Sequence, residues 1–140
     1  MLATINRTAT RKKVEQVLSI ARMYKRAGSV RKEMRTTSVM EPRWHGPTNT
    51  ISKPVEQTAV NNIEREAYMK QMYQNVTTAV AHLGEMERQV VERSYLDPKS
   101  DVPDYMLSIE MNLSERTFRR IKARAVMELA FILGLEVFEE

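Results

Sequence analysis

The chain has 140 residues, of which 42% are hydrophobic and 29% charged, and its formal net charge at pH 7 is +4. This length favours one modest domain with extensions, and the absence of cysteine excludes a disulfide framework and a thiolate metal site and favours a reducing compartment. No apolar run approaches the roughly 20 residues needed to span a membrane, so we expect no membrane association.

Positive charge is concentrated in two parts of the sequence. Residues 1–35 contain ten Lys or Arg and two Glu, a net of +8, whereas residues 36–140 have a net of −4. Within that acidic background, residues 114–124 contain five basic residues and one Glu. Two separate positive regions favour a polyanionic partner that is contacted at more than one place.

The first predicted element is a basic helix over residues 10–27. Its apolar residues recur at helical spacing at Val14, Val17, Leu18, Ala21 and Tyr24. Gly28 stands where a C-terminal cap would end the helix, so residues 1–28 form the first unit. Two interpretations are open: either its cations contact a nucleic-acid backbone, or its apolar side packs into a dimer or against the central helix.

The second unit, residues 29–56, has no sustained period and is rich in Ser, Thr, Asn and Pro, which predicts an irregular linker. The only tryptophan, Trp44, lies in this linker, either as an anchor or as a partly exposed loop residue. A long central helix follows over residues 57–83. Its predicted apolar stripe consists of Ile63, Ala67, Met69, Met72, Tyr73, Val76, Val80 and Leu83. This helix is either a packing element or an association surface, and Gly84 ends it.

The last unit, residues 84–140, begins with a helix that carries Met86, Val90, Val91 and Tyr95 up to Leu96. A second helix of about nine residues is predicted after Asp101, with Asp101 as its cap and Pro103 in its first turn. Asn112 then occupies a tight turn that needs a residue tolerant of positive φ, and Ser108 is small enough for a close helix crossing. The outline is that of a helix-turn-helix, with a generic helical hairpin as the alternative.

The helix after this turn joins a cap, a buried stripe and a basic outer face. Ser114 is the predicted N-cap. The predicted buried stripe consists of Phe118, Ile121, Ala125, Leu129 and Ile132. Arginines beside such a cap suit a DNA major groove, although a solvated basic face on an ordinary helix has the same composition. The candidate DNA-binding residues are Ser114, Glu115, Arg116, Thr117, Arg119, Arg120, Lys122 and Arg124.

Catalytic patterns are scarce in this sequence. The two histidines, His45 and His82, are far apart and belong to no zinc-binding motif. With four glycines in all, the chain also lacks the glycine-rich loops that bind nucleotide phosphates. We therefore expect no enzymatic activity, no metal site and no cofactor.

Residues 83–125 resemble region four of the bacterial sigma-70 family. The resemblance rests on LGEMERQVVERSYL at residues 83–96, on the following helix and turn, and on SERTFRRIKARA at residues 114–125. The sequence is most similar to the ArpU family of phage regulators, small sigma-like activators of late or packaging genes, which also place a helical extension and a polar linker before this module. Asn112 replaces the usual turn glycine and Ser108 the usual alanine, and the 97–104 connection is longer than in many relatives.

The resemblance implies an all-α fold, in which a helical N-terminal extension precedes a sigma-region-4-like helix-turn-helix. It places Glu115, Arg116, Arg119 and Arg120 at base-reading positions, and Lys122 and Arg124 toward phosphate or solvent. The expected function is sequence-specific binding of double-stranded DNA by a phage-type transcriptional regulator in the bacterial cytoplasm, with host RNA polymerase and a homo-oligomer as further partners. The alternatives are a small terminase-like packaging subunit and a helical protein-interaction module.

Overall fold

The computed structural model shows an all-α protein, as the sequence predicts, and it describes residues 4–37, 53–97 and 101–139. The side chains at 29–33, 35–37 and 53–59 are not among those described. The elements are α1 Arg7–Thr37, α2 Lys53–Ala81, α3 Glu85–Val91, the π-helical turn η1 Glu92–Leu96, α4 Asp104–Glu110 and α5 Glu115–Leu133. Trp44 and the middle of the predicted linker lie outside the described residues. None of the described helices combines the length and the apolar character that crossing a membrane requires.

The two long helices are longer than the sequence indicates. α1 does not end at Gly28 but continues to Thr37, and α2 begins at Lys53, so both ends of the predicted 29–56 linker are helical. A glycine inside a helix costs only about 1 kcal/mol relative to alanine, so glycine alone does not end one. Pro54 fits in the first turn of α2, where its missing N–H removes no helical hydrogen bond.

The main hydrophobic core joins the N-terminal half of α1 to the C-terminal half of the chain. It contains Val14, Val17, Leu18 and Ala21 from α1, Val76, Ala79, Val80 and Leu83 from α2 and its end, and Val91, Ala125, Val126, Leu129 and Ala130. The packing interpretation of α1 is therefore confirmed for this half of the helix. Residues 84–140 share this core with α1 and α2.

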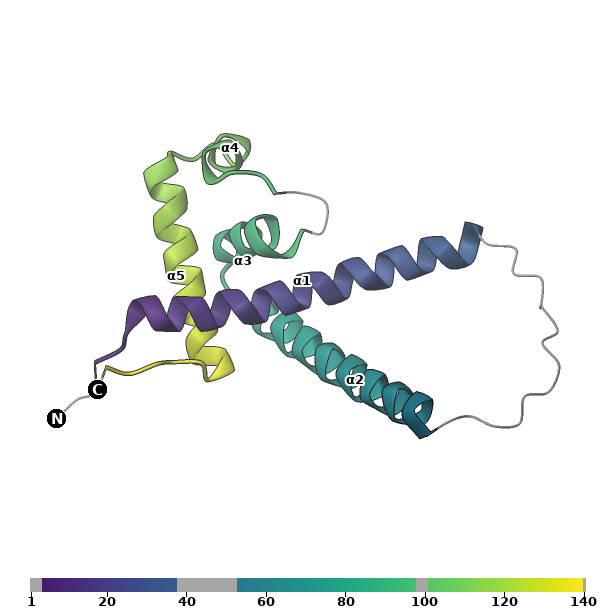
Figure 1. Ribbon diagram of the computed structural model, residues 1–140. Helices are drawn as coiled ribbons and strands as arrows, with labels where there is room; N and C mark the ends of the chain where they lie inside the picture. The colour runs from purple at the N-terminus through teal and green to yellow at the C-terminus, as the bar shows by residue number, and fades with distance from the viewer. Residues whose placement is uncertain (1–3, 38–52, 98–100, 140) are drawn as a thin grey trace.

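A second, smaller core lies beneath the helix-turn-helix. It consists of Val90 from α3, Leu107 from α4 and Phe118 from α5, with Val102, Met111, Leu113 and Ile121 packed around it. Figure 1 shows α4 and the start of α5 at the top of the molecule, away from the point where α1 and α2 cross. The two cores together fix the helix-turn-helix on the α1–α2 pair.

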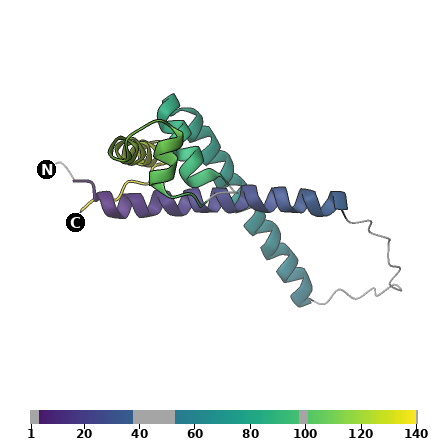
Figure 2. The same ribbon diagram turned by 90° about the horizontal axis from the view of Figure 1, so that it is seen from above.

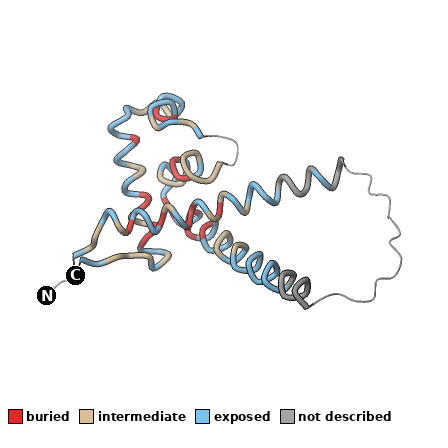
Figure 3. The backbone as a smooth tube through the Cα atoms, in the orientation of Figure 1, coloured by how far each residue is buried: buried red, intermediate tan, exposed pale blue. Residues whose placement is uncertain are grey.

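The predicted apolar stripe on α2 is only partly correct. Val76, Val80 and Leu83 are buried, but the side chain of Ile63 is 66% exposed and Ala67 is exposed as well. At about 100° per residue, Ile63 and Ala67 lie roughly 140° to 180° around the helix from the centre of the buried residues. Figures 1 and 2 show that the N-terminal part of α2, which carries Ile63 and Ala67, projects away from the body of the molecule, as does the C-terminal part of α1. Figure 3 shows that the described residues of this projecting part of α2 are exposed.

The residues before and at the start of α1 are joined to the segment that follows α5. The side chain of Asn6 accepts a hydrogen bond from the N–H of Ala9 at 3.1 Å, which caps the start of α1. Ile5 and Phe138 form an isolated antiparallel bridge. The buried hydroxyl of Thr10 accepts a hydrogen bond from the N–H of Val137 at 3.0 Å. These contacts fix the start of α1 to the segment that follows α5.

Candidate nucleic-acid interface

The first helix of the helix-turn-helix is shorter than predicted and starts differently. α4 has seven residues, and Pro103 occupies its N-cap position without a side-chain hydrogen bond. Asp101 is not the cap, because its carboxylate is 2.9 Å from the guanidinium of Arg22 on α1. A long-range ion pair with α1 therefore takes the carboxylate that the local pattern assigned to capping.

The turn between α4 and α5 has the geometry that the sequence indicates. Asn112 has a φ of 56°, in the left-handed region where Asn is tolerated better than most residues. The N–H of Leu113 donates to the carbonyl of Ser108 at 2.9 Å, and the N–H of Asn112 donates to the carbonyl of Ile109 at 3.1 Å. These two bonds form a Schellman motif, which ends α4 and turns the chain toward α5. Ser108 is buried, as a close crossing of the two helices requires.

α5 begins where predicted. The Oγ of Ser114 accepts a hydrogen bond from the N–H of Thr117 at 3.1 Å, and the Ser114 hydroxyl donates to the Thr117 Oγ1 at 2.8 Å. The hydroxyls of these two residues are therefore engaged in the cap. They orient the first turn of α5, whose N–H groups favour negative charge.

The inner side of α5 agrees with the predicted stripe except at its end. Phe118, Ala125 and Leu129 are fully buried, and Ile121 is partly buried. Ile132 is 48% exposed, while Val126 and Ala130 are buried in its place. The buried side shifts around the helix because the last turns of α5 pack against α1 and α2, whereas its first turns pack against α3 and α4.

The outer face of α5 is the exposed side of its first turns, and it brings Arg116, Arg119 and Arg120 together. A shallow hollow on this surface is lined by Glu115, Arg116, Arg119, Arg120 and Ala123. The guanidinium of Arg119 is 2.6 Å from the carboxylate of Glu115, one turn earlier. Among the described residues, Arg116 and Arg120 have no carboxylate within 4 Å and stay available to an anionic partner.

Two predicted site residues lie elsewhere. The ammonium of Lys122 is 3.0 Å from the carboxylate of Asp104 and 4.9 Å from the centre of the Tyr95 ring, and its side chain is only 14% exposed. Lys122 follows Phe118 by one turn, so its stem lies beside the buried side and its charge is used within the protein. Arg124 is 66% exposed and lies 3.7 Å from Glu87 on α3, at the edge of the outer surface.

Ion pairs that the sequence analysis does not predict connect the helices of the module. Arg93 on η1 contacts Asp97 at 2.7 Å and Glu110 at the end of α4 at 2.6 Å. The Asp104–Lys122 pair joins the start of α4 to α5. Spacing could have indicated the Arg93–Asp97 pair, which is four residues apart, but not the pairs between distant elements.

Tyr95 on η1 connects α1 with α5. Its hydroxyl donates to the Glu15 carboxylate at 3.2 Å, and desolvation, followed by the negative charge of Glu15, raises its pKa from 10.0 to about 12. The folded state therefore binds the hydroxyl proton of Tyr95 more tightly than the unfolded state does. Stability from this group is intact below pH 10 and is lost as the pH rises from about 10 to about 12.

Replacing Tyr95 with phenylalanine is expected to reduce the loss of stability between about pH 10 and pH 12. The variant lacks the group that ionises more readily in the unfolded state, so its unfolding free energy changes less across this window. Urea unfolding of both proteins at a series of pH values measures the difference. Parallel curves for the two proteins would contradict the assigned shift.

No protein-family model, curated protein or solved structure matches this chain. Within the described part of the chain there is also no group of three or more His, Asp or Glu side chains suited to hold a metal ion. The inference of function therefore rests on the geometry of the module and on the residues of its outer face.

Proposed function

We propose that this protein binds double-stranded DNA in a sequence-specific manner through the outer face of α5. One observation carries the proposal. Arg116, Arg119 and Arg120 share one exposed surface on the second helix of a helix-turn-helix whose turn, cap and core are all formed. That position is the one from which helix-turn-helix proteins read base edges in the major groove.

The side chains of the outer face of α5 suit two kinds of DNA contact, base readout at its centre and phosphate contact at its edge. Arginine donates two parallel hydrogen bonds to the O6 and N7 acceptors of guanine. Glu115 pairs with Arg119 one turn along the helix, and its carboxylate can accept a hydrogen bond from a cytosine amino group. Arg124, at the edge, is placed to contact a phosphate.

Within this class, we propose a regulator of phage or prophage type similar to the ArpU family, acting in the bacterial cytoplasm as an activator of late or packaging genes. The support is the sigma-like pattern of residues 83–125 together with the helix-turn-helix that these residues form. Host RNA polymerase is the further partner that this resemblance implies. The role requires no enzymatic activity.

Transcription in vitro tests this proposal. Purified protein and bacterial RNA polymerase are combined with templates that carry candidate phage late promoters, and the transcripts are measured with and without the protein. We expect a footprint on the promoter and a polymerase-dependent change in transcript. A protein that assembles and stimulates a packaging ATPase, without changing any transcript, would favour the terminase-like alternative, and indifference to DNA would favour the interaction module.

The projecting part of α2 favours assembly of several copies in either DNA-binding role. Val60 and Ile63 are 47% and 66% exposed and lie about 60° apart around the helix, on one face. Ile63 points away from the core side of α2, so α1 cannot cover it within one chain. Apolar residues on an unsupported helix are stabilised by packing against another helix, which a second copy provides.

Replacing Ile63 with glutamate is expected to convert a homo-oligomer into a monomer, because each copy would bring a charge into the apolar contact. Light scattering coupled to gel filtration, over a range of protein concentrations, measures the mass. Asn62→Glu is the matched control, since it adds the same charge about 100° around the helix. A wild-type protein that is monomeric throughout, or equal dissociation of both variants, would contradict the role of this surface.

A further inference from the structure

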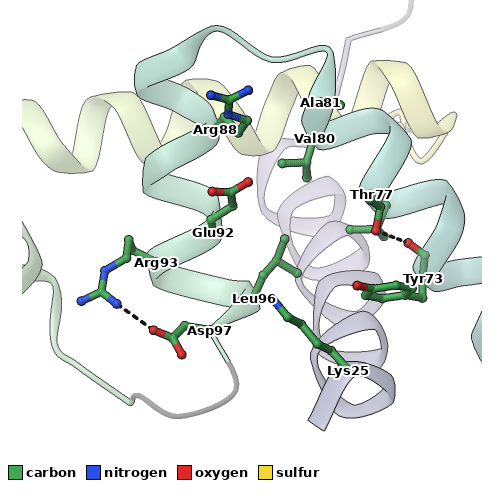
Figure 4. A pocket seen from close by; sticks show the side chains of 11 residues that line it. Lys25, Tyr73, Thr77, Val80, Ala81, Arg88, Glu92, Arg93, Leu96 and Asp97 are labelled. Carbon is green, nitrogen blue, oxygen red and sulfur yellow. Dashed lines mark hydrogen bonds and ion pairs between the residues drawn. The ribbon is translucent and has the colours of Figure 1, made fainter. Parts of the chain in front are cut away.

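A cleft of about 630 Å³ lies between α2 and the α3–η1 segment, with α1 running behind it. Its volume is within the roughly 300–1,000 Å³ of small-molecule sites. Figure 4 shows the side chains of Val80 and Leu96 directed into the cleft from opposite walls. Val76 adds to the apolar lining. Val76 and Val80 are only 1% and 3% exposed, so they form the floor of the cleft, and Leu96 is the apolar residue of its wall.

The wall formed by η1 is unusual. Glu92–Leu96 forms a π-helical turn, a rare conformation that occurs frequently at functional sites. Arg93 and Asp97 on this wall pair with each other at 2.7 Å. Arg93 is also paired with Glu110 at 2.6 Å, so the charges of Arg93 and Asp97 are engaged within the protein, and a ligand would meet the other ionisable side chains of the lining.

Those remaining side chains are Lys25, Arg88 and Glu92. None of the three has a hydrogen bond or an ion pair with another described residue. Figure 4 shows Lys25 and Tyr73 at the same end of the cleft as Leu96, and Arg88 at the other end. The Tyr73 ring packs against Tyr24 with a centroid distance of 5.1 Å, which orients its hydroxyl toward the cleft.

From this arrangement we propose that the cleft binds a small amphipathic carboxylate. Its apolar body lies against Leu96, over a floor formed by Val76 and Val80. Its carboxylate accepts hydrogen bonds from the Lys25 ammonium and the Tyr73 hydroxyl, two donors from different helices at one end of the site. This assignment is independent of DNA binding, because no residue of the outer face of α5 lines the cleft.

Titration with decanoate tests the site in the full-length protein, followed by ¹H–¹³C NMR of methyl groups. We expect saturable shifts at Val76, Val80 and Leu96 and none at Ile63, which is exposed on the projecting part of α2. Decylamine has the same chain and the opposite charge, and it should bind more weakly. Lys25→Gln should weaken decanoate binding about tenfold, the loss expected for one hydrogen bond to a charged group.

Two further variants make the result specific. Lys12→Gln removes an exposed cation of the same helix outside the cleft and should leave decanoate binding unchanged. Thr77→Phe places a ring at an exposed lining position and should abolish the shifts while the protein keeps its melting temperature. Equal binding of decanoate and decylamine, equal effects of Lys12→Gln and Lys25→Gln, or the absence of saturable shifts in the wild-type protein would overturn the proposal.

Discussion

Replacing Phe118 with alanine is expected to lower the unfolding free energy of the full-length protein by about 3–5 kcal/mol. The ring is fully buried and joins Val90 of α3 to Leu107 of α4. Its removal costs both the transfer energy of the ring and the cavity that remains. Urea unfolding followed by circular dichroism measures the change. The measurement requires the full chain, because the main core packs α5 against residues of α1 and α2.

Phe131→Ala is the matched control on the same helix. Its ring is 55% exposed, so the expected change is within about 0.5 kcal/mol. Similar losses for the two variants would show that the buried side of α5 is assigned wrongly.

Replacing Arg120 with alanine is expected to weaken binding to the specific site by about 1–3 kcal/mol, or roughly 5- to 150-fold. Its guanidinium has no acidic partner among the described residues, so the whole side chain is available to a guanine. Arg119→Ala should lose less, because Glu115 already engages that guanidinium. Fluorescence anisotropy with a selected duplex and a scrambled duplex measures both affinities.

The scrambled duplex distinguishes the roles of Arg120. A base-reading residue loses more affinity for the specific duplex than for the scrambled one, whereas a phosphate contact loses equally on both. Lys70→Ala, which removes an exposed cation of α2 outside both basic regions of the sequence, serves as the charge control. Equal losses for Arg120→Ala on the two duplexes would reduce this residue to a phosphate contact.

The helix-turn-helix could be predicted because its signals are local. The Ser114 cap acts within one turn, and the positive φ of Asn112 is a property of that residue and its neighbours. Phe118 follows the cap at a fixed step, so its burial also follows from the pattern. Short-range geometry of this kind is encoded in a few adjacent residues.

The errors occurred where distant segments compete with local signals. Asp101 is a residue type that often caps the N-terminus of a helix, but its carboxylate binds Arg22, which lies 79 residues earlier. Lys122 belongs to a basic run, yet Asp104 and Tyr95 turn it inward. Gly28 is typical of a helix end, but a single glycine does not outweigh the helical preference of its neighbours, and α1 continues to Thr37. The partners of Asp101 and Lys122 lie on other helices, so the residue spacing within one segment does not indicate them.

The most direct measurement is selection of bound duplexes from a random DNA library by the full-length protein, followed by sequencing. If the outer face of α5 reads bases, one short motif should be enriched, and an Arg116→Ala/Arg120→Ala double variant that unfolds like the wild type should enrich no motif. If the wild-type protein enriches no motif, and its affinity for DNA varies with salt concentration but not with sequence, the protein does not read DNA sequence and the central proposal is contradicted.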